Sequence, residues 1–360
     1  MINVTQSFLP PIEEYTAILN RAWEKKWLTN RGELILELEE KLGDFLKINN
    51  FFITTNGTLP LQIAIKALGL TKEIITTPFS YVATTSSIIW ENCTPIFVDI
   101  EEGSLTIDCN KIEDAITSET EAILVTHVFG NPCDIDAIDK IAKKYRLKVI
   151  YDAAHCFNVN YKGKSIFENG DISTVSFHST KLFHTGEGGA VFVKDKQLYD
   201  KVFYHHNFGH NGPENFHGLG INAKASELQA AMGLAVLPYI DIIIAKRKLL
   251  TELYETLLLD NKKVKTFSYR KGATRNYSYL PVIFEDEKNL LEVVKELKKT
   301  NVFPRRYFYP SLNTLDYLAE KKHMPISESI SKRILCLPLY YELTLADVNK
   351  ISLIIIETLN

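Results

Sequence analysis

One lysine of the chain lies in a turn that is rich in hydroxyl and histidine side chains. The segment Ser176–Lys181 has the sequence SFHSTK, and the glycine-rich sequence GEGG follows at Gly186–Gly189. A lysine that is partly buried among apolar and cationic neighbours has a lowered pKa, which makes its amine a usable nucleophile. A solvated surface position is the commoner fate of a lysine. The neighbouring motifs must decide between these two interpretations.

The sequence Asn56-Gly57-Thr58 lies between an expected strand and an expected helix. The free N–H groups and the positive dipole end of a helix start bind anions. Gly57 lets the backbone approach a ligand closely, and Thr58 is expected to cap the helix and to offer a hydroxyl. Pro60 fits the first helical turn, where its missing N–H costs little. The motif is typical of a phosphate site, and a plain capped loop is the alternative.

Asp152 follows directly on the apolar run Leu147–Tyr151. Ligands of parallel sheets bind just beyond the carboxyl ends of the strands, and a carboxylate there can pair with a positive ring nitrogen. An aspartate that caps the next segment is the alternative. An amine, a carboxylate and a helix-start anion site are, however, the three anchors that pyridoxal 5'-phosphate (PLP) needs. The three motifs together therefore predict a PLP site.

The elements that must position these groups alternate between strands and helices. Compact apolar runs of this kind are typical of strands buried on both faces, and the alternation favours a mostly parallel sheet covered by helices. The expected helices are Leu59–Leu70 and Ile135–Tyr145. The expected strands are Phe51–Thr54, Ile74–Thr76, Pro95–Ile100, Ala122–Thr126, Leu147–Tyr151, Ile172–Phe177 and Gly189–Val193.

In the last third of the chain the regular alternation of strands and helices ends. We expect one long helix at Ile240–Leu259 and a strand at Tyr277–Phe284, in which Pro281 favours an edge position. The lysines of Lys288–Lys299 are interpreted as the solvated face of an amphipathic helix, and Ala346–Thr358 as a terminal helix.

Length and composition limit the class of protein. A chain of 360 residues suggests two domains, which we expect at 1–244 and 245–360. Lysine plus arginine number 41 against 44 acidic residues, so the basic excess of a nucleic-acid binder is missing. The five scattered cysteines predict reduced thiols in a cytoplasmic protein. We find no signal-peptide pattern and no apolar run of about 18 residues that could span a membrane.

Several longer motifs of the sequence are specific to one protein family. The sequence resembles the DegT/DnrJ/EryC1/StrS family of sugar aminotransferases over nearly its whole length. The resemblance implies an α/β fold of the aspartate-aminotransferase type (PLP fold type I), with a mixed, mostly parallel sheet in the large domain and a smaller α+β C-terminal domain. The motifs that carry it are WLTN, NGT, ITTPFSYVAT, HVFGNPCDID, YDAAH, SFHSTK, GEGGAV, GLGINAKASELQAAMG and CLPLYYELTLADV.

The resemblance implies a role for each matching residue. Lys181 forms the Schiff base with PLP and shuttles the α-proton, while Asp152 pairs with the pyridine nitrogen. Tyr81 stacks on the ring, and His155 stands near the ring hydroxyl where many relatives have glutamine. The phosphate is held by Gly57, Thr58 and Ser176.

Further site residues come from other segments. By resemblance, Asn222 reaches the phosphate of the partner subunit, which implies a homodimer with shared active sites. Relatives have arginine two residues later, whereas this chain has Lys224, a point charge in place of a bidentate clamp. Thr29, Asn30 and Tyr309 lie in segments that line the sugar pocket of relatives.

The resemblance also implies the reaction, a ping-pong transfer of the amino group of L-glutamate to a nucleotide-linked keto-sugar. The FHSTK and GEGG motifs are like those of 4-keto-sugar enzymes, and VTQSFLPP, WLTN and NGTLPL favour dTDP-4-keto-6-deoxy-D-glucose as acceptor. Such a product, dTDP-4-amino-4,6-dideoxy-D-glucose, serves O-antigen or other surface glycan synthesis. The alternatives are a 3-keto-sugar or a UDP- or GDP-linked acceptor, a PLP-dependent dehydratase, and a non-catalytic regulator.

The histidines raise the question of a metal site. His205, His206, His210 and His217 lie close together in the sequence. The glycines and the proline of residues 208–213 disfavour a helix there, so His206 and His210 need not share a face. We therefore expect polar loop residues near a dimer interface, and no metal.

Overall fold

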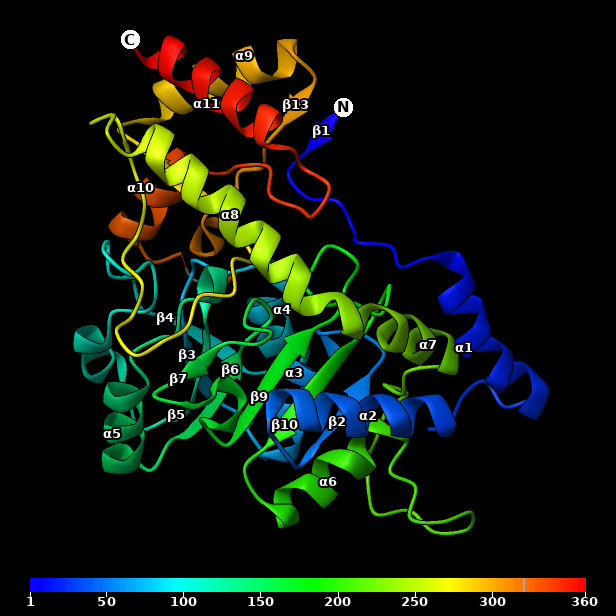
Figure 1. The fold of residues 1–360 in the computed structure, drawn as a ribbon. Coiled ribbons are helices and arrows are strands. Elements are labelled where there is room, and N and C mark those ends of the chain that lie inside the picture. The colour runs from blue at the N-terminus through cyan, green and yellow to red at the C-terminus, as the bar shows by residue number, and fades with distance from the viewer. Residues whose placement is uncertain (320) are drawn as a thin grey trace.

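The computed structural model describes residues 1–319 and 321–360, and its first two thirds are built around one seven-stranded sheet (Figure 1). The strands are β2 (Phe51–Thr54), β3 (Glu73–Thr76), β4 (Thr94–Phe97), β5 (Thr120–Thr126), β6 (Lys148–Asp152), β9 (Ile172–Ser176) and β10 (Gly189–Val193). They lie in the order β2-β10-β9-β6-β5-β3-β4. The strands from β9 to β4 are parallel, and β10 is antiparallel to both of its neighbours. The predicted mixed, mostly parallel sheet is confirmed.

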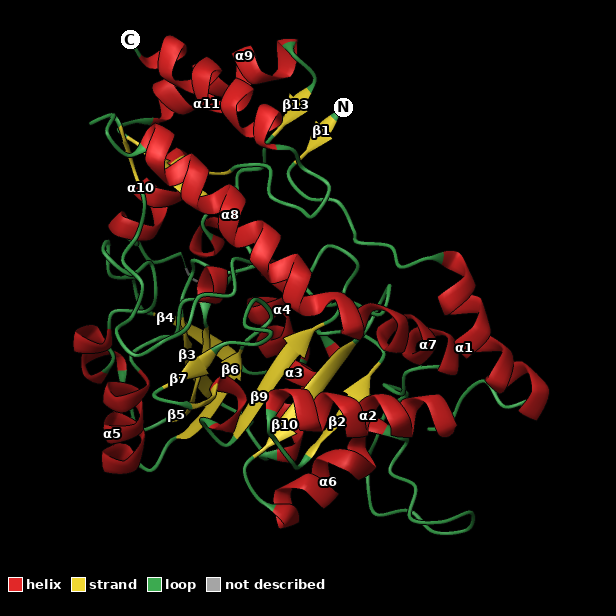
Figure 2. Cartoon of the chain, in the orientation of Figure 1, coloured by secondary structure: helices red, strands yellow, loops and turns green. Residues whose placement is uncertain are grey.

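Helices cover both faces of this sheet (Figure 2). Successive strand residues point to opposite faces, and in β6 Ile150 packs into one core cluster while Val149 and Tyr151 pack into another. The helices on the Ile150 face are α3 (Leu59–Ala67), α4 (Val82–Trp90) and α6 (Lys196–His206). Those on the Tyr151 face are α2 (Glu33–Leu46), α5 (Ile135–Tyr145) and α7 (Glu227–Val236). The sheet is therefore buried on both sides, as its apolar runs predict.

The C-terminal third forms a second core around a small antiparallel sheet in the order β11-β12-β14. Its strands are β11 (Val264–Lys265), β12 (Pro281–Phe284) and β14 (Ile334–Cys336). Its helices are α8 (Ile240–Leu258), α9 (Glu287–Lys299), α10 (Pro325–Arg333) and α11 (Leu345–Leu359). The N-terminal strand β1 (Ile2–Asn3) pairs with β13 (Val302–Phe303), so the start of the chain lies beside the C-terminal third (Figure 1). The domain division at 244/245 stays a prediction.

The remaining elements are short, apart from the N-terminal helix. A two-stranded hairpin joins β7 (Asn160–Tyr161) to β8 (Lys164–Ser165). The 3-10 turns are Cys109–Lys111, Glu113–Ala115, Val128–Gly130, Ile166–Glu168, Leu237–Tyr239 and Leu312–Thr314. Helix α1 (Ile12–Lys25) packs on α7.

The strand that contains Pro281 was expected at a sheet edge. This prediction was wrong, because β12 lies between β11 and β14. Pro281 is the first residue of β12 and pairs only with Cys336 of β14. The two residues of β11 pair further along, with Ile283 and Phe284. Since no β11 residue faces Pro281, its missing N–H interrupts no ladder on that side.

The stretch from α7 through α8, residues 227–258, is long and apolar enough to cross a membrane by length and composition. The short apolar runs of the sequence did not predict such a stretch. Helix α7 contacts both α1 and α2, and it buries Ala230, Ala231 and Leu234 in the main core. Its apolar side chains are thus used for packing within the fold.

Candidate active site

A cavity of about 380 Å³ lies at the carboxyl ends of the parallel strands. Asp152 ends β6, Ser176 ends β9, and Tyr81 precedes α4 after β3. Because these strands run in one direction, their ends meet at one edge of the sheet. The predicted site residues that line the cavity are Gly57, Thr58, Tyr81, Asp152, His155, Ser176 and Lys181.

Lys181 donates a hydrogen bond from Nζ to the hydroxyl oxygen of Tyr279, at 3.2 Å. Burial lowers the pKa of Lys181 to about 8, Asp152 opposes this shift, and the charge of Arg305 adds to it. The neutral amine, which is the nucleophilic form, is therefore more abundant near neutral pH than in an exposed lysine. The surface-lysine alternative does not describe this side chain.

Asp152 is held from two sides. Its Oδ2 accepts a hydrogen bond from Thr84 Oγ1 at 2.7 Å, and its Oδ1 accepts one from the backbone N–H of Ala154 at 3.1 Å. Burial raises the pKa of Asp152, while these hydrogen bonds and the charge of Lys181 lower it. The bond to Ala154 belongs to the local turn, and Thr84 of α4 fixes the carboxylate at the cavity.

The start of α3 was expected to be capped by Thr58, and this was wrong. The side-chain oxygen of Asn56 accepts hydrogen bonds from the backbone N–H groups of Thr58 and Leu59, both at 2.9 Å, and Thr58 makes no cap bond. The Asn56 amide reaches both donors because it stands two and three residues before them. A Cβ atom at Gly57 would come within 2.8 Å of the Cβ of Ser176, so glycine permits this close approach.

His155 accepts a hydrogen bond at Nδ1 from the backbone N–H of Phe129, at 3.1 Å. Burial lowers the pKa of His155 well below its ordinary value, so the ring is neutral. Its carbonyl accepts hydrogen bonds from Asn276 Nδ2 at 2.9 Å and Ser278 Oγ at 3.1 Å. The backbone of His155 therefore joins the strand-end turn to the segment that carries Tyr279, and the two ring centres lie 4.6 Å apart.

The cavity combines the donor set that PLP requires. The amine of Lys181 and the buried carboxylate of Asp152 line the same cavity. Gly57, just before α3, also lines it and lies close to Ser176 at the end of β9. These groups suit the aldehyde, the pyridine nitrogen and the phosphate, respectively. The sequence matches the DegT/DnrJ/EryC1/StrS aminotransferase family over residues 12–355. The chain belongs to this family. The aminotransferase therefore uses PLP.

Relatives of the aminotransferase act on nucleotide-linked sugars. A dTDP-4-amino-4,6-dideoxy-D-glucose transaminase of Escherichia coli is 39% identical, over 98% of this chain and 97% of that protein. One from Shigella dysenteriae is 41% identical, over 95% of each chain. A GDP-perosamine synthase of Vibrio cholerae is 30% identical, over 89% of each chain. The protein is a nucleotide-sugar aminotransferase.

Solved structures agree with this assignment. DesI, solved in the presence of its TDP-sugar product, superimposes with a TM-score of 0.93 at 29% identity, covering 98% of this chain and 91% of that chain. Spr1654 of Streptococcus pneumoniae, solved in a PLP form, has a TM-score of 0.90 at 20% identity, covering 99% of this chain and 100% of that chain. The second likeness shows the fold alone.

The remaining predicted site residues lie outside the cavity lining of this single chain. Lys224 Nζ donates to Asn222 Oδ1 at 2.8 Å and lies 4.5 Å from the centre of the Phe208 ring. Tyr309 lies under the guanidinium of Arg306, 3.6 Å from it. The residues in this group are Thr29, Asn30, Asn222, Lys224 and Tyr309.

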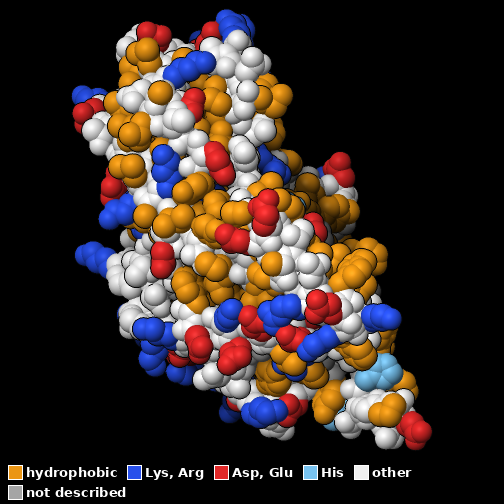
Figure 3. Space-filling view, turned by 45° about the vertical axis from the view of Figure 1, so that its right-hand side comes forward, with side chains coloured by type: hydrophobic (Ala, Val, Ile, Leu, Met, Phe, Trp, Pro, Cys, Tyr) orange, Lys and Arg blue, Asp and Glu red, His pale blue; other side chains and the backbone are white. Residues whose placement is uncertain are grey.

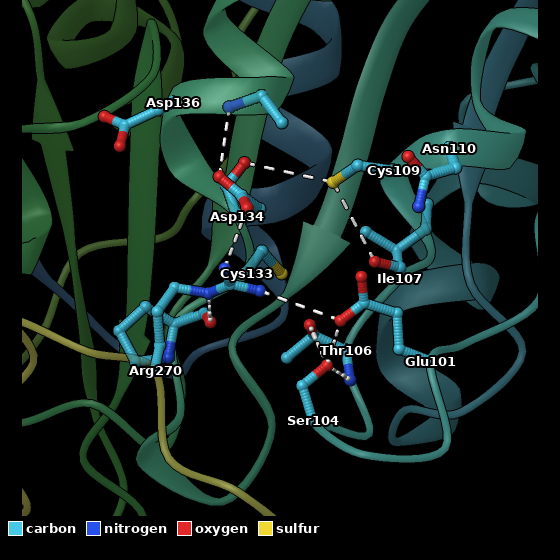
Figure 4. Close-up of polar contacts among 12 residues, drawn as sticks. Glu101, Ser104, Thr106, Ile107, Cys109, Asn110, Cys133, Asp134, Asp136 and Arg270 are labelled. Atoms are coloured by element: carbon cyan, nitrogen blue, oxygen red, sulfur yellow. Dashed lines mark hydrogen bonds and ion pairs between the residues drawn. The ribbon is translucent and has the colours of Figure 1, made fainter.

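Tyr279 is the main residue that the sequence analysis missed. It stands just before the apolar strand β12, where a tyrosine is ordinarily part of the core. The loop that contains it, residues 266–280, is anchored by Arg270 to the segment between β5 and α5 (Figure 4). Arg270 pairs with Asp134 at 2.8 Å and donates from Nε to the carbonyl of Pro132 at 2.9 Å. This anchor and the contacts of Asn276 and Ser278 hold Tyr279 at the cavity.

The histidine loop shows no metal-binding arrangement. His205 donates from Nδ1–H to the Leu219 carbonyl at 2.5 Å, and the ring centre of His217 lies 4.5 Å from that of Tyr204. Within residues 1–319 and 321–360, no group of three or more metal-binding side chains is found. His205 and His206 lie in the last turn of α6, so the expectation that they are loop residues was wrong, whereas His210 and His217 follow the helix.

Proposed function

We propose that the aminotransferase transfers the amino group of L-glutamate to dTDP-4-keto-6-deoxy-D-glucose. The product is dTDP-4-amino-4,6-dideoxy-D-glucose, for O-antigen or another surface glycan. The proposal is carried by the Lys181 amine and the Asp152 carboxylate in one cavity, in a chain about 40% identical over nearly its full length to two transaminases named for this product.

The residues act on the cofactor and on protons. PLP supplies the electron sink that makes the α-proton of an amino acid acidic. Lys181 would hold the cofactor through its amine and would take up and return the protons of the transfer. Asp152 would keep the ring nitrogen protonated, and Tyr81 would lie against the ring. His155 would lie near the ring hydroxyl, and Gly57, Thr58 and Ser176 would hold the phosphate.

The phosphate site is completed in our proposal by Asn222 of a second copy, in a homodimer. Apolar side chains are exposed beside α1 and α7, among them Trp23, Trp27 and Leu228. Leu28 lies on the same side, since its carbonyl accepts a hydrogen bond from the Glu227 N–H at 2.9 Å. Figure 3 brings this side forward and shows apolar side chains between charged ones. Such a face favours association with a second subunit.

Mixed dimers test this sharing of active sites. Asn222→Ala and Lys181→Ala proteins are each expected to be nearly inactive. Co-expressed in equal amounts, they should recover about a quarter of wild-type activity, because half of the dimers are hybrids and each hybrid has one intact site. No recovery in hybrid dimers, purified through a different affinity tag on each subunit, would contradict shared sites.

We also propose a cytoplasmic location. All five cysteines are buried free thiols, as suits a reducing compartment. The glutamate and nucleotide-sugar substrates of the reaction are water-soluble and need no membrane contact.

The decisive experiment incubates the wild-type enzyme and PLP with L-glutamate and a panel of keto-sugars. The panel contains dTDP-, UDP- and GDP-linked 4-keto-6-deoxysugars and a dTDP-linked 3-keto-6-deoxysugar. We expect 2-oxoglutarate and a dTDP-linked 4-amino sugar, identified by mass spectrometry and NMR. Preference for the GDP-sugar would move the enzyme toward its GDP-perosamine relatives. Loss of keto-sugar without 2-oxoglutarate would indicate a dehydratase, and no turnover would indicate a regulator.

A further inference from the structure

Three hydroxyl side chains lie in a row that ends at the Asp152 carboxylate. Ser80 Oγ lies 2.7 Å from Thr126 Oγ1 and 2.7 Å from Thr84 Oγ1. Thr84 Oγ1 in turn lies 2.7 Å from Asp152 Oδ2. The three hydroxyl residues are at most 2% exposed, and Ser80 and Thr126 line the same cavity as Asp152. We call Thr126, Ser80 and Thr84 the hydroxyl row.

The hydroxyl row is assembled from three elements at the carboxyl edge of the large sheet. Thr126 is the last residue of β5 and pairs in register with Asp152, the last residue of β6. Ser80 lies in the segment between β3 and α4, and Thr84 lies in the first turn of α4. Because each hydroxyl is carried by an element of the framework, its position is set by the fold.

The carboxylate fixes the direction of every hydrogen bond in the row. An ionised carboxylate only accepts hydrogen bonds, so Thr84 donates its single hydroxyl hydrogen to Asp152. Thr84 must therefore accept from Ser80, and Ser80 must in turn accept from Thr126. The longer contact of 3.4 Å between Thr84 and Thr126 carries no hydrogen, because both hydrogens are already used. All three O–H groups thus point toward the carboxylate.

Donors that all point one way stabilise a negative charge at the end of the row. A hydrogen bond to an ionised group is about twice as strong as one between neutral groups. A hydroxyl that accepts a hydrogen bond becomes a better donor, which strengthens the next bond by about 10–30%. Burial raises the pKa of Asp152, and the hydrogen bond from Thr84 lowers it. The hydroxyl row therefore counters the effect of burial and favours the carboxylate over the carboxylic acid.

The next residue of α4 shows that a buried hydroxyl is not always used here. Thr85 follows Thr84 directly and is fully buried. Within residues 1–319 and 321–360, its Oγ1 has no hydrogen-bond partner. Helix α4 thus carries one hydroxyl that is directed at Asp152 and one that is not. Thr85 therefore offers a matched control for the hydroxyl row.

We propose that Ser80 and Thr126 are positioning residues for the cofactor, because they keep Asp152 ionised through Thr84. The inference rests on the pairing of Asp152 with the pyridine nitrogen proposed above. The nitrogen and the carboxylate share one proton, and donors directed at the carboxylate place this proton on the nitrogen. A protonated nitrogen makes the ring an effective electron sink. The hydroxyl row thus extends control of the ring beyond the carboxylate itself.

The test observes the ring nitrogen directly. PLP labelled with 15N at this atom is bound to the enzyme, and its NMR shift distinguishes a protonated from an unprotonated ring. Asp152→Asn marks the unprotonated limit. Thr84→Val, Ser80→Ala and Thr126→Val each remove one hydroxyl and nearly keep the shape of the side chain. Thr85→Val is the control, since it removes the unused hydroxyl.

We expect Thr84→Val to move the proton toward the carboxylate by about tenfold or more, as for loss of a hydrogen bond to a charged group. Ser80→Ala and Thr126→Val should move it in the same direction by about twofold, because they only weaken the next bond. Thr85→Val should equal wild type. Thr126→Ser keeps the hydroxyl and should also equal wild type, which separates the hydroxyl from a change in packing.

A double variant tests whether Ser80 acts through Thr84. The ring shift of Thr84→Val/Ser80→Ala should equal that of Thr84→Val alone, and an additive shift would overturn the inference. Unchanged shifts in both Ser80→Ala and Thr126→Val, or an equal shift in Thr85→Val, would overturn it as well.

The measurement separates this inference from the proposals on which it rests, because it does not depend on turnover. An unprotonated ring in the wild-type enzyme would reject the role of Asp152 and, with it, that of the hydroxyl row. A wild-type enzyme that forms no 2-oxoglutarate from glutamate would instead reject the proposed function, whatever the ring shifts of the variants are.

Discussion

Two walls of the cavity differ in how they are built. The sheet wall consists of Gly57, Asp152, Ser176 and Lys181, which follow or end strands of the large sheet. The C-terminal wall consists of Tyr279, Arg305, Tyr307 and Phe308, which come from loops beside the small sheet.

The two walls also differ in chemistry. The sheet wall carries an amine and a carboxylate of opposite charge, with hydroxyls around them, and it is complementary to the fixed parts of the cofactor. The C-terminal wall carries aromatic rings and one cation, and it contacts Lys181 through Tyr279. The contrast favours a division of roles, in which the sheet wall holds the cofactor and the C-terminal wall positions the lysine.

Lys181→Ala should have the largest effect, a loss of at least about 10⁴-fold in 2-oxoglutarate formation, because both the nucleophile and the proton carrier are removed. PLP should still bind without a covalent link, because the rest of the sheet wall is intact, and dialysis with absorbance detection measures this. Lys201→Ala, an exposed lysine of α6, is the control. A Lys181→Ala enzyme of wild-type rate would remove the basis of the proposed function.

Asp152→Asn should reduce kcat/KM by about 100-fold or more, because a neutral amide does not hold the ring nitrogen protonated. The change keeps the shape of the side chain and its bond from Thr84. Thr84→Val is the matched variant, and it should cost less, because the carboxylate remains. Steady-state kinetics and the absorbance of bound PLP measure both. If Thr84→Val were the more harmful change, the charge of Asp152 would not be what matters.

Tyr279→Phe should lower activity by about tenfold, through loss of one hydrogen bond to the lysine. A hydrogen bond to the charged form favours that form, so its loss should move the pKa of Lys181 below about 8. The covalent capture of PLP by the apo-protein needs the neutral amine, and its pH midpoint should shift downward. Tyr317→Phe, an exposed tyrosine, is the control. An unchanged midpoint would separate Tyr279 from the lysine.

Arg270→Ala should have the smallest effect on the cofactor. It removes the ion pair with Asp134 and the bond to the Pro132 carbonyl, and should destabilise the fold by about 1–3 kcal/mol. The absorbance of bound PLP should be unchanged, whereas the KM for glutamate should rise as the 266–280 loop loosens. Denaturant unfolding and kinetics measure these. A loss of PLP affinity with no change in KM would show that the two walls are not independent.

The accuracy of the sequence predictions follows the same division. Asp152, Ser176 and Lys181 could be placed at one edge because each follows an apolar run and parallel strand ends converge. Even there, the capping residue of α3 was predicted wrongly. Asn56 and Thr58 both carry side-chain oxygens that can cap the helix, and Asn56 does so. The central position of β12 was missed because a proline excludes only one ladder bond, at a place where β11 has already ended.

The sequence by itself determined the sheet, the lysine, the aspartate and the anion site, because each depends on residues that are neighbours in the chain. The tertiary structure alone decided the opposite wall. Tyr279 meets Lys181 across 98 residues of chain, and Arg305 reaches the same cavity from still further along. These contacts depend on how the 266–280 loop and the small sheet pack against the large one, through ion pairs and buried hydrogen bonds that have no periodic pattern in the sequence.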